Sequence, residues 1–232
     1  MKTKFALWIV GLSLLGAVPV FATGTSLNFN KPNTLSGDTA TYTFDSHTIT
    51  ATGYQCTDNT LNSCSTDGVS LATKSGGLGE MGLGIAGGSH GDNEIEAENF
   101  IQLDFSQFAS LGITSLTFQI ESVQNGEGFR LFESNTSGMP GASPVFTATG
   151  NGTNNPNSIL TETVSVNFAQ NAYLDFSALK SGGGDNDVLL GTMSTPSSGG
   201  PGPTPEPGTL VLFGTGMLVV GGVMRRYLPR SA

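Results

Sequence analysis

The segment between Thr23 and Thr204 is poor in basic residues. Its four basic residues are Lys31, Lys74, Arg130 and Lys180, scattered along the chain. Seventeen Asp and Glu residues oppose them, which gives this segment a formal net charge of −13. A protein that binds nucleic acid needs clustered Lys and Arg to neutralise phosphates. The sequence therefore excludes nucleic acid as a partner.

Histidine and cysteine are also scarce, with two of each in the chain. A zinc site needs four ligands, and neither His47 nor His90 stands at a ligand spacing from Cys56 and Cys64. Histidine clusters, a cysteine nucleophile and a lysine in an apolar segment are missing as well, which favours a non-enzymatic protein. Because Cys56 and Cys64 are the only pair, we expect them to form a disulfide in an oxidising compartment.

One short motif has the form of an enzyme signature. Residues 87–91 read Gly-Gly-Ser-His-Gly and match the G-x-S-x-G pattern of serine hydrolases. That pattern requires a strand before the serine and a helix after it, whereas here a glycine-rich loop leads into an acidic run. The remaining histidine, His47, lies upstream in an expected strand, so a Ser-His-Asp triad is not supported.

The N-terminus has the organisation of a secretory signal peptide. Two lysines within the first four residues precede an uncharged apolar stretch at 5–20, and Val20-Phe21-Ala22 provides a cleavage site for signal peptidase. The sequence therefore predicts a signal peptide at 1–22 and a mature chain that begins at Thr23. A retained N-terminal anchor is the alternative, but the apolar stretch is shorter than the roughly 20 residues of a spanning helix.

A second apolar run stands at the C-terminus. Residues 208–224 carry no charge, and Arg225, Arg226 and Arg230 follow. The run predicts a transmembrane helix with its C-terminal end in the cytoplasm, because positive charges remain on that side. A buried core helix is the alternative, and Gly214, Gly216, Gly221 and Gly222 within the run argue against it.

The order of these features resembles a known sorting signal. Pro205, Glu206 and Pro207 precede the apolar run and the arginines, and this arrangement is similar to the PEP-CTERM signal of exosortase substrates. The resemblance implies that Pro-Glu-Pro is the recognition element, that the helix holds the protein in the inner membrane for a time, and that the arginines retain it there. After exosortase processing the protein would reach the cell envelope, the surface or the medium. Such tails are sometimes labelled ice-binding protein C-terminal domains, a label that gives no indication of ice binding.

Between the two ends the sequence predicts one all-β domain. Residues 194–204 are rich in Pro, Gly and Ser and form a linker, so the domain spans 23–193 and the sorting signal 205–232. Short alternating patterns predict eight to ten antiparallel strands, and these favour a β-sandwich of jelly-roll type, with a barrel as the alternative. We expect strands at 39–44, 47–54, 68–73, 100–105, 115–122, 129–134, 143–150, 163–168, 172–177 and 187–192. The alternation at 100–105 and 115–120 predicts one buried face for each of those strands.

The acidic run at 92–98 permits three interpretations. Asp92, Glu94 and Glu96 offer hard oxygen ligands in a loop preceded by glycine, which is what Ca²⁺ prefers. Alternatively, Glu94, Glu96 and Glu98 form the solvated face of a strand. A pair among these glutamates and Asp104 could also serve a glycoside hydrolase, which needs two carboxyls at a suitable separation.

A second acidic segment, at 182–190, reads GGGDNDVLL and has some likeness to the calcium-binding nonapeptide of β-rolls. It occurs once, while such rolls bind ions between stacked copies, so we interpret it as a turn that leads into the last strand.

Three functions of different classes follow from these observations. The first is a non-enzymatic exported protein of the extracellular matrix or biofilm, in contact with exopolysaccharide. The second is a glycan-binding module, either calcium-dependent or built on aromatic stacking. The chain's one tryptophan, Trp8, lies in the predicted signal peptide, which weakens the stacking version. The third is a hydrolase of envelope polymers.

Overall fold

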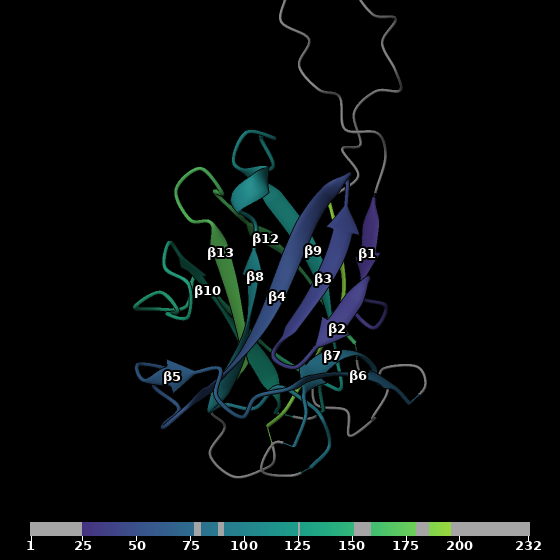
Figure 1. Cartoon of the computed structure of the whole chain (residues 1–232), viewed down its shortest axis with the longest axis vertical. Coiled ribbons are helices and arrows are strands. Elements are labelled where there is room, and N and C mark those ends of the chain that lie inside the picture. The colour runs from purple at the N-terminus through teal and green to yellow at the C-terminus, as the bar shows by residue number, and fades with distance from the viewer. Residues whose placement is uncertain are drawn as a thin grey trace, which may run out of the picture. The chain divides into compact units, whose positions relative to one another are not determined.

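A computed structural model of the chain (Figure 1) describes residues 25–76, 80–87, 91–124, 126–150, 159–179 and 186–195. Residue contacts divide the chain into two units, Met1–Pro196 and Ser197–Ala232, and all described residues belong to the first. The predicted signal peptide, most of the predicted linker and the predicted helix at 208–224 lie outside the described residues. Among the described residues, no helix is long and apolar enough to span a membrane.

The described residues form fourteen strands and one short 3-10 helix, and every strand pair is antiparallel. The prediction of an all-β antiparallel fold is confirmed. The elements are β1 (Ser26–Asn28), β2 (Thr34–Ser36), β3 (Thr39–Phe44), β4 (His47–Cys56), β5 (Cys64–Ser65), β6 (Leu71–Ser75), β7 (Met81–Ile85), β8 (Asn99–Asp104), η1 (Ser106–Phe108), β9 (Ser115–Glu121), β10 (Gly128–Ser134), β11 (Phe146–Thr149), β12 (Leu160–Ser165), β13 (Tyr173–Ala178) and β14 (Leu189–Ser194).

The strands build two sheets (Figure 1). The smaller sheet has the order β12-β9-β14-β7-β6, with β1 also paired to β14. The larger sheet has the order β11-β10-β13-β8-β4-β3-β2, with β5 paired to β4. From β7 to β14 the chain passes from one sheet to the other at every connection except the β10–β11 hairpin. Neighbouring strands therefore often come from distant parts of the sequence.

The two sheets share one hydrophobic core. Phe118 of β9, in the smaller sheet, meets Phe176 of β13, in the larger sheet, with ring centroids 4.8 Å apart. Phe129 of β10 lies against Phe176 in turn, and all three rings are fully buried. In β9 the buried residues alternate with partly exposed ones from Ser115 to Ile120, so the predicted single buried face is confirmed there.

The prediction of one buried face is wrong for β8. Phe100 and Gln102, which point away from the core residue Ile101, are also buried. The reason is that β8 lies inside the larger sheet and that other segments cover its outer face. Phe100 belongs to a second apolar cluster with Tyr54, Cys56, Leu61 and Phe132. Beside it, Gln102 accepts a hydrogen bond from the Gly138 amide (2.9 Å) and donates one to Asp175 (2.7 Å).

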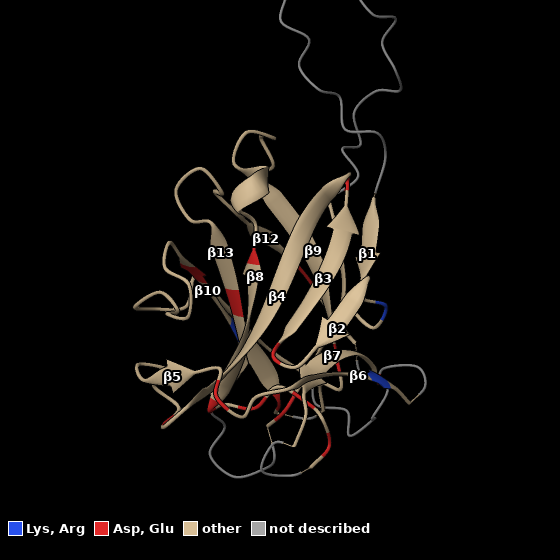
Figure 2. Ribbon diagram, viewed as in Figure 1, with Lys and Arg blue, Asp and Glu red and all other residues tan. Residues whose placement is uncertain are grey.

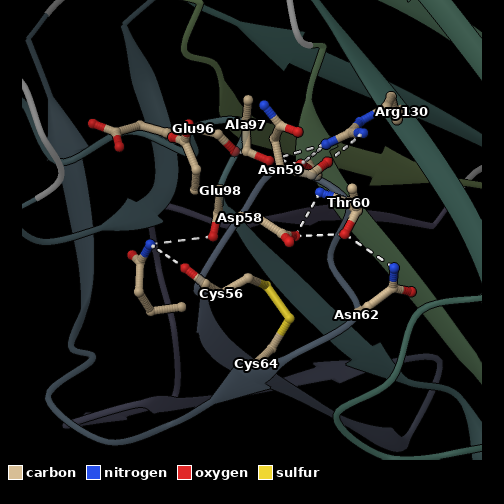
Figure 3. The surroundings of a disulfide bond; sticks show 12 residues. Cys56, Asp58, Asn59, Thr60, Asn62, Cys64, Glu96, Ala97, Glu98 and Arg130 are labelled. Atoms are coloured by element: carbon tan, nitrogen blue, oxygen red, sulfur yellow. Dashed lines mark hydrogen bonds between the residues drawn. A yellow bond between two sulfur atoms is a disulfide. The ribbon is translucent and has the colours of Figure 1, made fainter.

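A disulfide closes the loop between β4 and β5 (Figure 3). Cys56 and Cys64, the pair predicted from the sequence, are joined at an S–S distance of 2.05 Å. Inside the loop the carboxylate of Asp58 accepts hydrogen bonds from the amide and the hydroxyl of Thr60. The second apolar cluster lies under this loop, because Cys56 and Leu61 belong to it.

Arg130 of β10 fixes the disulfide loop to the larger sheet. Its guanidinium donates to the carbonyl of Asn59 in the loop (3.3 Å), to the carbonyl of Ala97 (3.0 Å) and to the carbonyl of Ala178 (3.1 Å). It also donates to the hydroxyl of Ser177 (2.9 Å). Figure 3 shows Arg130 facing Asn59 and Ala97. One side chain therefore ties together the loop, the segment before β8 and β13.

Candidate functional site

Three carboxylates from two distant segments meet beside the smaller sheet. Asp92, Glu94 and Asp187 each place an oxygen within 4.8 Å of the others, and we call this group the acidic cluster. Asp92 and Glu94 precede β8, and Asp187 precedes β14. An isolated bridge joins the two segments, since Ile95 and Val188 exchange backbone hydrogen bonds of 2.8 and 3.0 Å. Figure 2 shows Asp and Glu gathered on the loops below β7 in the view.

Gly84 of β7 determines how closely the 91–95 segment approaches the sheet. A Cβ atom at this position would lie 2.0 Å from the carbonyl oxygen of Asn93, which no side chain tolerates. Asn93 itself has a positive φ of 65°, a conformation that asparagine adopts more readily than most residues. The backbone of Asn93 and Glu94 therefore lies directly against β7.

The two oxygens of Glu94 have different surroundings. Its Oε1 forms an ion pair with Nζ of Lys74 and accepts a hydrogen bond from the hydroxyl of Ser122 (2.9 Å). Its Oε2 is buried and has no hydrogen-bond donor among the described residues, and the same holds for Oδ1 of Asp92. Only 2% of the Glu94 side chain is exposed. Lys74 also contacts Glu80 at 3.0 Å, so its single positive charge is shared.

The electrostatics of the acidic cluster show an excess of negative charge. Burial, together with hydrogen bonding to Asp92 and Glu94 and the charges of these two carboxylates, raises the pKa of Asp187 to about 9. Burial by itself would lower the pKa of Lys74, but Glu94 and Glu80 more than compensate, and the pKa of Lys74 is raised. Lys74 alone does not balance three ionised carboxylates, so the cluster requires a further positive partner, which is either a proton or a cation.

The structure changes two sequence predictions about the acidic run. The predicted solvated face of Glu94, Glu96 and Glu98 is wrong, because Glu94 and Glu96 are 2% and 5% exposed and only Glu98 is exposed. Residues 92–98 form β pairing with another described segment only through the bridge between Ile95 and Val188. They do not form a strand with one solvent-exposed face. Glu96 is not a member of the acidic cluster.

Asp187 takes the third position, and sequence reasoning missed it. The segment around it was interpreted as a turn, because its spacing matches a repeating calcium motif only once. Asp187 is brought to Glu94 by the pairing of β14 with β7 and by the bridge between Val188 and Ile95, and no local pattern encodes either contact.

The residues considered for hydrolysis do not converge in the described structure. Ser89 and His90 lie outside the described residues. His47 lies at the start of β4, where its Nδ1 is 2.7 Å from the carbonyl oxygen of Asp45 and its ring contacts Phe108. Asp104 is the last residue of β8 and accepts a hydrogen bond from the Ser106 amide. The whole length of β8 separates it from residues 92–98.

The family comparison concerns the C-terminus. The model of the PEP-CTERM protein-sorting motif matches residues 203–226. The chain carries a PEP-CTERM sorting motif. The PEP-CTERM match includes Pro205, Glu206, Pro207, the apolar run at 208–224, Arg225 and Arg226, and it ends before Arg230. Neither curated proteins nor solved structures give a match to this chain.

A PEP-CTERM motif implies export, processing by an exosortase and delivery toward the cell envelope. It occupies only the end of the 232-residue chain and contains none of the described β domain. The motif therefore gives the route of the protein, while the chemistry of the domain has to be argued from its own residues.

Proposed function

We propose that this protein is a non-enzymatic component of the cell envelope or extracellular matrix. A signal peptide at 1–22 directs its export, the helix at 208–224 holds it in the inner membrane, and an exosortase then releases the β domain. The observation that carries this proposal is the PEP-CTERM match at 203–226, which follows a Pro-rich segment and an all-β domain.

We propose further that the domain is a β-sandwich of jelly-roll type. Its two sheets share one core, and consecutive strands from β7 to β14 alternate between the sheets apart from the β10–β11 hairpin, which supports this architecture. Such a domain presents a stable surface to polymers without needing a catalytic cleft.

The use of the described side chains supports a non-enzymatic role. Two of the three basic residues in the described ranges, Lys74 and Arg130, are committed to structural contacts. A pocket of about 250 Å³ lies between the η1 region and residues 166–169, and no acid or base lines it. A general acid or base needs access to a substrate, and neither the buried acidic cluster nor this pocket offers that combination.

Glycan binding is the second candidate function, and the acidic cluster favours its calcium-dependent version. A bound cation would hold together the segments that carry Asp92, Glu94 and Asp187, and sugar hydroxyls could approach it from the side of Asp92, the partly exposed member. Retention of the purified protein on envelope polysaccharides that EDTA abolishes would favour glycan binding over a purely structural matrix role.

The sorting proposal is tested in a host that has an exosortase. We expect the wild-type domain to appear in the outer envelope or medium without residues 208–224, whereas Glu206→Ala leaves the intact chain in the inner membrane. Pro201→Ala, which lies just outside the matched residues, is the control and should behave as wild type. Equal release of the wild-type and Glu206→Ala proteins would show that the motif is not recognised.

A further inference from the structure

We infer that Asp92, Glu94 and Asp187 bind a calcium ion. This assignment is independent of the sorting route and differs from the ligand set that the sequence predicts, because Asp187 takes the place of Glu96. The three side chains come from segments that a backbone bridge holds together, so the arrangement does not depend on one flexible loop.

The first argument is the unpartnered oxygen of a buried side chain. Glu94 is only 2% exposed. Its Oε2 has no hydrogen-bond donor among the described residues, although its Oε1 has two, Lys74 and Ser122. Burying an ionised carboxylate oxygen without a partner costs several kcal/mol. Lys74 and Ser122 fix the carboxylate through Oε1 and leave Oε2 available to a ligand, as partners behind a metal ligand do.

The second argument is that Asp92, a neighbour of Glu94 in the acidic cluster, also has a buried carboxylate oxygen without a donor among the described residues. This oxygen is Oδ1, and the members of the acidic cluster each place a carboxylate oxygen within 4.8 Å of the others. The carboxylates of Asp92, Glu94 and Asp187 therefore lie close enough together to share one cation. A shared cation would give both unpartnered oxygens a positive partner.

The ligand chemistry favours Ca²⁺ over other metals. All three side chains offer hard carboxylate oxygens, and no histidine or sulfur belongs to the cluster within the described residues. Ca²⁺ accepts six to eight oxygens in variable geometry, including both oxygens of one carboxylate, so three carboxylates and water complete its shell. Mg²⁺ demands octahedral geometry and retains its waters, so we expect it to bind this cluster less well.

The alternative is that Asp187 carries a proton and donates it to its two neighbours, with no metal involved. The two states predict different responses. If the carboxylates share a proton, Ca²⁺ changes the stability of the folded chain no more than its ionic strength does. If they bind the ion, the stability of the folded chain increases with the occupancy of the site.

The test uses the full chain purified in detergent and freed of metal with EDTA. Thermal melts are recorded in CaCl₂, MgCl₂ and NaCl of matched ionic strength, and calcium affinity is measured by titration calorimetry. We expect a rise in the melting temperature that is specific to Ca²⁺. The Asp187→Asn variant should bind Ca²⁺ at least about tenfold more weakly, since charge count sets calcium affinity.

Two further variants separate the cluster from general acidity. Glu98→Gln removes an exposed carboxylate of the same run and should leave calcium affinity unchanged, and Glu96→Gln should do the same if Asp187 is the third ligand. If Asp187→Asn does not fold, Asp92→Asn, at a partly exposed position, provides the same measurement. Identical melts in CaCl₂ and matched NaCl would overturn the assignment. So would a Glu96→Gln variant that loses calcium binding while the Asp187→Asn variant keeps it.

Discussion

At the scale of single residues, the described domain buries several polar groups and pairs most of them. Arg130 satisfies four acceptors with one guanidinium, and burial lowers its pKa without removing its charge, since an arginine pKa remains far above neutrality. Asp175 is the contrasting case. It is fully buried on the outer face of the larger sheet, its Oδ1 accepts a hydrogen bond from Gln102, and its Oδ2 has no partner among the described residues.

Asp175 therefore makes the stability of the domain depend on pH. Burial raises the pKa of its carboxyl from 3.8 to about 8, although the hydrogen bond from Gln102 acts in the opposite direction. The folded state then binds a proton that the unfolded state has lost, so the free energy of unfolding falls as the pH rises from about 4 to about 8. The slope from this one group is at most about 1.4 kcal/mol per pH unit.

We expect the Asp175→Asn variant to lose this part of the pH dependence. Urea unfolding between pH 5 and 8 should give a flatter profile for the variant, which gains stability relative to wild type as the pH rises. Asp67→Asn, at an exposed position, is the control and should follow wild type. Parallel profiles for wild type and Asp175→Asn would show that Asp175 is ionised in the folded protein at pH 5.

At the scale of elements, the strands that the sequence predicted are those with alternating apolar residues. The predicted strand at 39–44 coincides with β3, and those near 47–54, 129–134 and 172–177 match β4, β10 and β13 within two residues. Four strands, β1, β2, β5 and β7, were not predicted. Three of them are too short to show a period, and β7 reads Met-Gly-Leu-Gly-Ile, in which glycine replaces the side chains that mark a strand.

The glycines of β7 also explain why the acidic cluster was only partly predictable. The sequence indicated Asp92 and Glu94, because acidic residues near a glycine form a local signal. Asp187 joins them only after Gly84 lets the 91–95 segment lie on β7 and the bridge at Ile95 connects it to Val188. A contact between residues almost a hundred positions apart depends on topology, which local patterns do not contain.

The close packing at Gly84 predicts a specific sensitivity. Gly84→Ala places a methyl group against the Asn93 carbonyl, so the 91–95 segment must move, and we expect a loss of about 1–3 kcal/mol in the free energy of unfolding. Gly76→Ala is the matched control: its Cβ would meet only the Glu80 residue, at 3.4 Å, and should change stability by less than about 0.5 kcal/mol. Equal stability of Gly84→Ala and wild type in urea would contradict the close approach.

At the scale of the whole molecule, the chain has one described β domain between two segments that concern its route. The PEP-CTERM match accounts for the C-terminal segment, and the opposite end remains a prediction from the order of charge, apolar stretch and small residue. The acidic balance of the chain between Thr23 and Thr204 does not suit binding to the phosphates of nucleic acid.

The mature N-terminus follows from this organisation. We expect N-terminal sequencing or mass spectrometry of the exported protein to find Thr23 as its first residue. An Ala22→Asp substitution should block signal peptidase and leave the intact leader on the chain, while Thr25→Ala, beyond the cleavage site, should be processed normally. Recovery of Met1 on wild-type protein in membrane fractions would identify the leader as a permanent anchor.

The position of β14 has a consequence for how the protein is made. β14 is the last strand of the described domain, yet it lies inside the smaller sheet and pairs with β9, β7 and β1. A chain that crosses the membrane from its N-terminus exposes β7 and β9 with unpaired edges until Leu189–Ser194 has emerged, and unpaired edges invite aggregation. Only a short segment separates Ser194 from the sorting motif at 203. Translocation must therefore be nearly complete before the sheet can close, so the domain finishes folding only when the sorting motif follows close behind it.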